Sequence, residues 1–347
     1  MSVNKIRVLL VNDSKYMLQF LQDIINSDAE LDVIDTAKDG NEALRKLSRI
    51  DVDVVVTDLE MPNLDGISLL SKIMSINPVP VIIVSSYSQE GSQIVFDCLE
   101  KGAVDFVSLP HEKQDDISDF SEQLISKIKI ADNVNLLALN EIPTERYTVN
   151  FNNLDTSTTK IIVVIGASTG GPKVVSSILA NIPKHIPAGF ILIQHMSKGF
   201  TDSYAKRLAK LSSLTIKVAQ DGDIIQPGLV LIAPADYHLM IVPPNLVYLD
   251  QSPKRFGVRP SINVSMITAA EVFQSKTIGV LLTGMGHDGG FGMKAIKQRG
   301  GKTLAQDEES CVVFGMPKEA KELNSVDKFI SAEKLAKVIT EEVMMLV

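Results

Sequence analysis

The sequence lacks the features that mark a membrane-spanning or disulfide-stabilised protein. None of its apolar runs approaches the roughly 18 consecutive residues that a membrane span needs. Its 347 residues contain two cysteines, Cys98 and Cys311, which lie far apart and have no metal-ligand spacing. Residues 1–7 lead straight into an aliphatic run and do not have the shape of a signal peptide. We therefore expect a cytoplasmic protein in a reducing compartment, with no membrane insertion.

The charge distribution disfavours nucleic acid as a partner. Residues 1–130 hold 12 Lys and Arg against 22 Asp and Glu, and the remaining residues hold 22 against 20. A nucleic-acid-binding half would show a clear basic excess, and a helix-turn-helix pattern is also missing. No pair of histidines has zinc-ligand spacing, which disfavours a zinc hydrolase. The length is typical of two domains, and 45% hydrophobic with 22% charged residues is an ordinary globular composition.

The first part of the chain alternates between short aliphatic runs and segments whose apolar residues have helical spacing. This pattern predicts a five-fold β-α repeat, which implies a flavodoxin-like α/β domain with a parallel sheet covered on both faces. The expected strands are residues 6–11, 31–37, 52–57, 79–84 and 104–107, and the helices between and after them end near residue 130. Ligands of such sheets bind at the carboxyl ends of the strands.

Polar residues follow three of these strands. Asn12 and Asp13 come after the first strand, Asp58 ends the third, and Ser85-Ser86 follows the fourth. Two carboxylates at one sheet edge suit Mg²⁺, and a nearby hydroxyl could bind a phosphoryl oxygen. The alternative is that the aspartates are loop residues or helix N-caps.

Together with Glu60-Met61-Pro62 and Asp65-Gly66, these residues resemble the receiver domain of two-component response regulators. The resemblance implies Mg²⁺-dependent phosphorylation of Asp58 by a histidine kinase. It also implies Asp13, Asp58 and the backbone of Glu60 as metal ligands, with Ser85 as the switch hydroxyl.

Two positions depart from the receiver pattern. Asn12 stands where receivers have the first of two acidic residues, and Leu109 stands where they have a lysine before a proline. Leu109 cannot pair with Asp58 or neutralise a phosphoryl group. Its presence removes a charge-assisted contact worth about 1.5–3 kcal/mol.

A linker is predicted between the receiver, residues 1–130, and a second domain, residues 160–347. Residues 131–159 lose periodicity and are rich in Asn, Asp and Thr. Within them, Leu136-Leu137-Ala138-Leu139 forms a short apolar patch that could dock on a domain.

The second domain begins with a strand that breaks into small residues. Five aliphatic residues, 161–165, predict a fully buried strand of a doubly wound, mostly parallel sheet. Residues 166–170 match G-x-S-x-G, which places Ser168 on a strand-to-helix turn as a candidate nucleophile. The alternatives are a plain glycine-rich turn or a loop that cradles a phosphate. The G-x-G-x-x-G spacing of dinucleotide-binding turns is not present.

Candidate partners for Ser168 follow two other aliphatic strands. His195 comes directly after residues 190–193, and Asp288 lies in the glycine-rich turn after residues 277–282. The carboxyl ends of parallel strands share one sheet edge, so we expect a Ser168–His195–Asp288 triad there. His238 could contact substrate or be a hydrogen-bonded strand residue, and His111 and His185 look incidental.

The motifs of this half resemble the chemotaxis-type protein-glutamate methylesterases. The motifs are Gly166-Ala167-Ser168-Thr169-Gly170-Gly171, Gln194-His195-Met196, Arg259-Pro260-Ser261, Leu282-Thr283-Gly284-Met285-Gly286 and Ser310-Cys311-Val312-Val313-Phe314-Gly315-Met316-Pro317. Asn263 departs from the family, which often has Asp there.

That resemblance implies hydrolysis of γ-glutamyl methyl esters on methyl-accepting chemoreceptors, often with deamidation of receptor glutamines. The esterase itself would need no cofactor. The N–H of Thr169, the residue after the nucleophile, is a reasonable oxyanion donor, and the resemblance implies the N–H of Met285 as the other. The receiver would cover the site until Asp58 is phosphorylated. The rival interpretation is a response regulator whose second half binds a partner without catalysis.

Overall fold

The computed structural model describes residues 5–85, 89–110, 114–139, 142 and 160–347. Ser86, His111 and most of the expected linker lie outside these ranges. The chain separates into two compact units, Met1–Asn140 and Glu141–Val347. The expected bounds of 1–130, 131–159 and 160–347 stay a prediction. In the described residues, no helix is both long and apolar enough to span a membrane.

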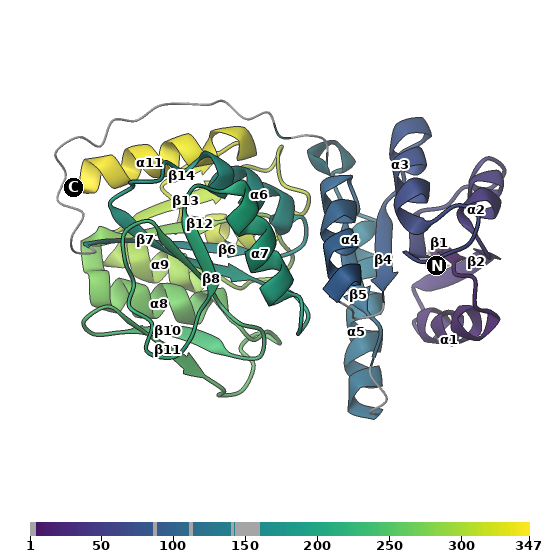
Figure 1. The fold of residues 1–347 in the computed structure, drawn as a ribbon, viewed down its shortest axis with the longest axis horizontal. Coiled ribbons are helices and arrows are strands. Elements are labelled where there is room, and N and C mark those ends of the chain that lie inside the picture. Colours follow the sequence, from purple (N-terminus) through teal and green to yellow (C-terminus); the bar gives the residue numbers. More distant parts are fainter. Residues whose placement is uncertain (1–4, 86–88, 111–113, 140–141, 143–159) are drawn as a thin grey trace. The chain divides into compact units, whose positions relative to one another are not determined.

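The first unit is a parallel sheet between two layers of helices (Figure 1). Its described strands have the order β2-β1-β3-β4-β5, and every pairing is parallel. Helix α1 packs on α5, while α2, α3 and α4 pack in a row on the other face. The elements are β1 Ile6–Val11, α1 Lys15–Asn26, β2 Leu31–Ala37, α2 Gly40–Leu47, β3 Val54–Asp58, α3 Gly66–Ile76, β4 Val81–Ser85, α4 Gln89–Glu100, β5 Asp105–Ser108, α5 Gln114–Ala131 and a 3-10 turn at Leu136–Leu139.

Helix caps explain several of the polar residues that follow strands in this unit. Ser14, Asp39 and Asp65 accept hydrogen bonds from backbone N–H groups in the first turns of α1, α2 and α3. Asp13 and Asp58 do not cap these helices. The predicted five-fold β-α repeat and its flavodoxin-like fold are therefore confirmed, and Asp13 and Asp58 are left for the site at the sheet edge.

The second unit is built on a larger parallel sheet. The described strands have the order β14-β13-β12-β6-β7-β9-β8, and a separate antiparallel hairpin, β10-β11, packs on α8. The strands are β6 Ile161–Ala167, β7 Ala188–Gln194, β8 Thr215–Val218, β9 Leu229–Ile232, β10 His238–Val242, β11 Leu246–Asp250, β12 Thr277–Leu281, β13 Lys302–Gln306 and β14 Lys328–Ile330.

Helices cover both faces of this sheet. Helices α6, α7 and α11 pack together on one face, and α8, α9 and α10 on the other (Figure 1). All seven residues of β6 and all seven of β7 are buried, as strands covered on both faces must be. The helices are α6 Gly171–Asn181, α7 Thr201–Leu211, α8 Ile262–Phe273, α9 Gly290–Gln298, α10 Met316–Glu322 and α11 Leu335–Leu346, with 3-10 turns at Gln274–Lys276 and Ala332–Lys334.

The predicted doubly wound sheet is thus confirmed. Strands β12, β6 and β7 are neighbours at its centre, and all three run in the same direction. The turns that follow these strands therefore meet at one edge.

Candidate active site

Ser168 lies in the short turn between β6 and α6. Its N–H donates to the carbonyl of Thr283 at 3.1 Å, and its carbonyl accepts from the N–H of Gly171 at 2.8 Å. Gly170, at the start of α6, has φ +75°, a conformation that L side chains rarely adopt. The turn is therefore held by backbone contacts, and the Ser168 side chain is left partly exposed.

The turn that follows β12 lies directly beside Ser168. A Cβ on Gly284 would come within 2.5 Å of the Ser168 Cβ, closer than real Cβ contacts permit. Met285, the next residue, is half exposed. A glycine is needed here because the turn after β12 and the turn that holds Ser168 approach each other closely.

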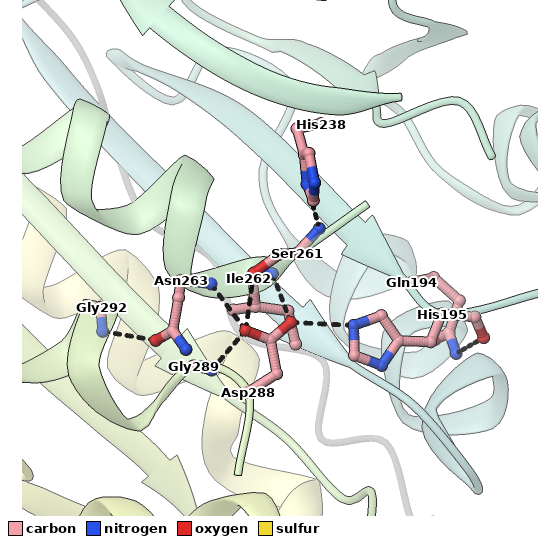
Figure 2. Close-up of polar contacts among 9 residues, drawn as sticks. All are labelled: Gln194, His195, His238, Ser261, Ile262, Asn263, Asp288, Gly289 and Gly292. Carbon is pink, nitrogen blue, oxygen red and sulfur yellow. Dashed lines mark hydrogen bonds and ion pairs between the residues drawn. The ribbon is translucent and has the colours of Figure 1, made fainter. Parts of the chain in front are cut away.

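His195 and Asp288 are in contact although 93 residues separate them. The Nε2 of His195 lies 3.1 Å from the Oδ2 of Asp288 (Figure 2). The imidazole is 13% exposed and the carboxylate 4% exposed. Since Nε2 faces the carboxylate, Nδ1 is the nitrogen left to act on a serine. Among the described residues, no hydrogen bond joins the Ser168 hydroxyl to His195.

The start of helix α8 surrounds Asp288 with donors. Its Oδ1 accepts from the Ser261 hydroxyl at 2.8 Å and from the N–H groups of Asn263 at 3.0 Å and Gly289 at 3.1 Å. Its Oδ2 accepts from the N–H of Ile262 at 2.6 Å (Figure 2). Free N–H groups at a helix N-terminus favour negative charge.

This environment keeps Asp288 ionised. Burial alone would raise the pKa of its carboxyl, but the hydrogen bond and charge of His195 and the N–H groups of Asn263 and Ile262 outweigh it, so the pKa is lowered. A buried, charged carboxylate beside an imidazole fixes the ring and stabilises its protonated form.

His238 stabilises the start of α8 through a hydrogen bond with Ser261. It is fully buried, and its Nδ1 accepts from the N–H of Ser261 at 3.1 Å. Its Nε2 lies 3.2 Å from the carbonyl of Pro253, so Nε2 carries the proton and the ring is neutral. Of the two interpretations open for His238, the hydrogen-bonded strand residue holds. The remaining described histidines, His185 and His287, are exposed, and His287 pairs with Glu319 at 2.8 Å.

Gln194 connects the nucleophile's turn to that of the histidine. Its Nε2 donates to the carbonyl of Ser168 at 2.9 Å and to the carbonyl of His195 at 3.1 Å. The side chain is buried, being 3% exposed. Sequence reasoning included Gln194 in a motif without giving it a role, although a buried amide directly before a candidate base was the available signal.

Asn263, the position that departs from the resembled family, lies in the first turn of α8. Its Oδ1 accepts from the N–H of Gly292 at 2.7 Å, and its buried Nδ2 has no partner among the described residues. The Asn263 side chain therefore connects α8 to α9, while the backbone N–H of the same residue binds Asp288.

The receiver unit brings its predicted residues to one sheet edge. Asp58 accepts from the N–H of Leu59 at 2.6 Å and of Glu60 at 3.4 Å, and from the Asn12 amide at 2.8 Å. An open pocket of about 520 Å³ beside it is lined by Asp13, Leu59, Glu60, Met61, Pro62, Asp65, Ile67 and Ile94. Burial, assisted by the charges of Asp13 and Glu60, raises the pKa of Asp58 against the pull of the two N–H groups.

This edge fits a magnesium ion with few protein ligands. The described residues contain no cluster of three or more His, Cys, Asp or Glu side chains arranged for a metal. Asp13 and Asp58 supply two carboxylates, and Mg²⁺ commonly binds one or two carboxylates and completes its shell with water and phosphate oxygens. Ser85 is buried at the end of β4, the strand next to β3.

The two units thus define a class of protein: a response-regulator receiver joined to a hydrolase domain with a buried His–Asp pair. Residues 163–339 match the family model of the CheB methylesterase, and residues 8–119 match that of the response regulator receiver domain. The chain therefore belongs to the protein-glutamate methylesterase/protein-glutamine glutaminase family.

Two similar proteins span nearly the full length of the chain. It is 41% identical to the protein-glutamate methylesterase/protein-glutamine glutaminase of Pyrococcus abyssi over 99% of this chain and 95% of that protein. It is 43% identical to the Thermotoga maritima protein of the same name, over 97% and 98%. The crystal structure of the T. maritima CheB methylesterase catalytic domain is 46% identical, with a TM-score of 0.51, over 52% of this chain and 97% of that domain.

Proposed function

We propose that the second unit hydrolyses glutamyl methyl esters on methyl-accepting chemoreceptors, with Ser168 as nucleophile, His195 as base and Asp288 as the group that orients the base. The observation that carries this proposal is the contact of His195 with the ionised, helix-bound Asp288, on the sheet edge that also presents Ser168. Catalytic hydrogen bonds are often loose before substrate binds, so the serine–histidine bond would form in the complex.

In the first step, the Ser168 hydroxyl oxygen attacks the ester carbonyl while Nδ1 of His195 takes its proton. The N–H groups of Thr169 and Met285 would bind the oxyanion, each such donor being worth about 3–4 kcal/mol. The C–O bond to the methoxy group then breaks, and methanol leaves with the proton from His195.

In the second step, water attacks the acyl-enzyme and His195 again takes a proton. The C–O bond to Ser168 breaks, His195 returns its proton to the serine oxygen, and the glutamate carboxylate is released. The same sequence with ammonia as the leaving group would deamidate receptor glutamines.

The receiver would control access to this site through phosphorylation of Asp58 by a chemotaxis histidine kinase. Asp13, Asp58 and the backbone of Glu60 would hold Mg²⁺, which when bound supplies positive charge beside the transferred phosphoryl group. Ser85, buried on the adjacent strand, would be the hydroxyl that responds to phosphorylation.

Methanol release from methylated receptor membranes tests both parts. We expect release by the full-length protein, faster with acetyl phosphate and Mg²⁺, and loss of release in Ser168→Ala with a normal thermal melt. A rate of methanol release that does not change with the phosphodonor would contradict the phosphorylation switch but support the esterase activity. No release, together with no labelling of Ser168 by a serine-directed fluorophosphonate, would favour a non-catalytic output domain.

A further inference from the structure

The amide of Asn12 has a fixed orientation at the end of β1. Its Oδ1 accepts from the N–H of Ser14 at 2.8 Å, and its Nδ2 donates to Oδ2 of Asp58 at 2.8 Å. A backbone N–H can only donate and a carboxylate can only accept, so the contacts determine which end of the amide faces Asp58. The side chain is 2% exposed, which excludes competing water from most of its surface.

The two oxygens of Asp58 have different partners. Oδ1 accepts from two backbone N–H groups, those of Leu59 and Glu60. Oδ2 accepts from Asn12. Among the described residues, Asn12 is therefore the side chain that donates to the candidate phosphoacceptor.

Acidic groups act on Asp58, and no described cation forms an ion pair with it. The charges that act on it are those of Asp13 and Glu60, and none of the ion pairs between described residues involves it. Leu109, which follows β5, adds no charge at the position where receivers carry a lysine. A second carboxylate in place of the Asn12 amide would face Oδ2 across a hydrogen-bond distance and repel it.

We propose that Asn12 and Leu109 are a compensating pair, in which the neutral donor of Asn12 takes over the contact with Asp58 that a lysine makes elsewhere. The exchange of Asp for Asn removes one negative charge, and the exchange of Lys for Leu removes one positive charge, so the site's net charge is kept. This inference rests on the proposed phosphorylation of Asp58.

In the reaction, Oδ2 of Asp58 forms a bond to phosphorus while the bond from phosphorus to acetate in acetyl phosphate breaks. Acetate leaves with the electron pair, and no proton transfer is needed. Asn12 positions Oδ2 for this attack. Its amide is neutral, so it adds no negative charge to the site, and its N–H stabilises the negative charge on Oδ2.

A double-mutant cycle on the full-length protein tests the pairing. The rate of Asp58 labelling by acetyl phosphate with saturating Mg²⁺ is measured by intact-protein mass spectrometry. We expect Asn12→Asp to label at least tenfold more slowly than wild type. Adding Leu109→Lys to that variant should recover most of the loss, and Leu109→Lys should raise the labelling rate by a much larger factor in the Asn12→Asp background than in wild type.

Asn41→Asp is the matched control, because it makes the same chemical change at an exposed position of α2 and should label like wild type. The Mg²⁺ dissociation constant, measured by calorimetry, should fall in Asn12→Asp, which gains a third carboxylate, and return toward wild type in the double variant.

Three outcomes would overturn the inference alone: wild-type labelling in Asn12→Asp, equal effects of Leu109→Lys in both backgrounds, or an unchanged Mg²⁺ affinity in Asn12→Asp. No labelling of the wild type would overturn both the inference and the proposed switch, while methanol release would still report on the esterase.

Discussion

The hydroxyl of Ser261 donates to Oδ1 of Asp288 at 2.8 Å, from the residue that caps helix α8. Both side chains are buried. The same residue offers its N–H to His238, so one serine connects the fully buried histidine to the carboxylate that binds His195. The orientation of the candidate base, His195, is therefore set by a chain of contacts that runs from His238 through Ser261 to Asp288.

Ser261→Ala should lower kcat for methanol release about tenfold. It removes a hydrogen bond to a charged group, worth about 1.5–3 kcal/mol, and leaves Asp288 freer to turn away from His195. The matched control is Ser265→Ala on the same helix, because the Ser265 hydroxyl donates to the carbonyl of Leu239 at 2.6 Å. Equal losses of kcat in the two variants would show that Ser261 has no special connection to catalysis.

Gln194→Glu should slow hydrolysis at least tenfold while the fold is retained. The substitution keeps the shape of the side chain but replaces the amide that donates to the carbonyls of Ser168 and His195 with an acceptor. Steady-state methanol release and circular dichroism would be compared with Gln220→Glu, the same change at an exposed position. Unchanged turnover in Gln194→Glu would mean that the two turns are held in place without this amide.

Gly284→Ala should impair both stability and the reactivity of Ser168. The added Cβ would meet the Ser168 Cβ and the Met316 Cε, each at 2.5 Å. Such overpacking typically costs about 1–3 kcal/mol, and here it would displace the nucleophile's turn.

Gly286→Ala is the control for this steric effect. Gly286 has φ +89°, with no atom within 4 Å of an added Cβ, so the change costs about 1–2 kcal/mol of backbone strain without touching Ser168. Serine labelling by a fluorophosphonate should fall in Gly284→Ala alone. A similar fall in both variants would indicate general loosening of this edge.

Asp58→Asn should stabilise the receiver unit at neutral pH in the absence of Mg²⁺. Burial and acidic neighbours raise the pKa of Asp58, so ionisation opposes folding. The contribution of a group with a raised pKa is present below its unfolded pKa of about 3.9 and is lost as pH rises through the folded value.

The advantage of Asp58→Asn should therefore appear at pH 7 and vanish below about pH 4, where the wild-type carboxyl is protonated in both states. Thermal melts in EDTA, with Tm raised by a few degrees at pH 7, would check it. A variant that is less stable than wild type at pH 7 would show that the N–H and amide donors outweigh the cost of burial.

The alternation of aliphatic runs and helical periodicity determined the fold of both units. The aliphatic runs of β6 and β7 each carry a signal of burial, because strands covered on both faces are rich in apolar residues. The parallel arrangement then follows from the helices between them, and with it the meeting of the turns that hold Ser168, His195 and Asp288.

Tertiary structure alone decided how those residues are held. Three donors to Asp288 come from the start of α8. The sequence of that segment does not indicate which carboxylate these donors will bind. The role of His238 depends on which atoms meet its two nitrogens, and that of Gln194 on two carbonyls in different turns. Contacts between distant segments are set by packing of the whole unit, whereas the sequence states only the local preference of each segment.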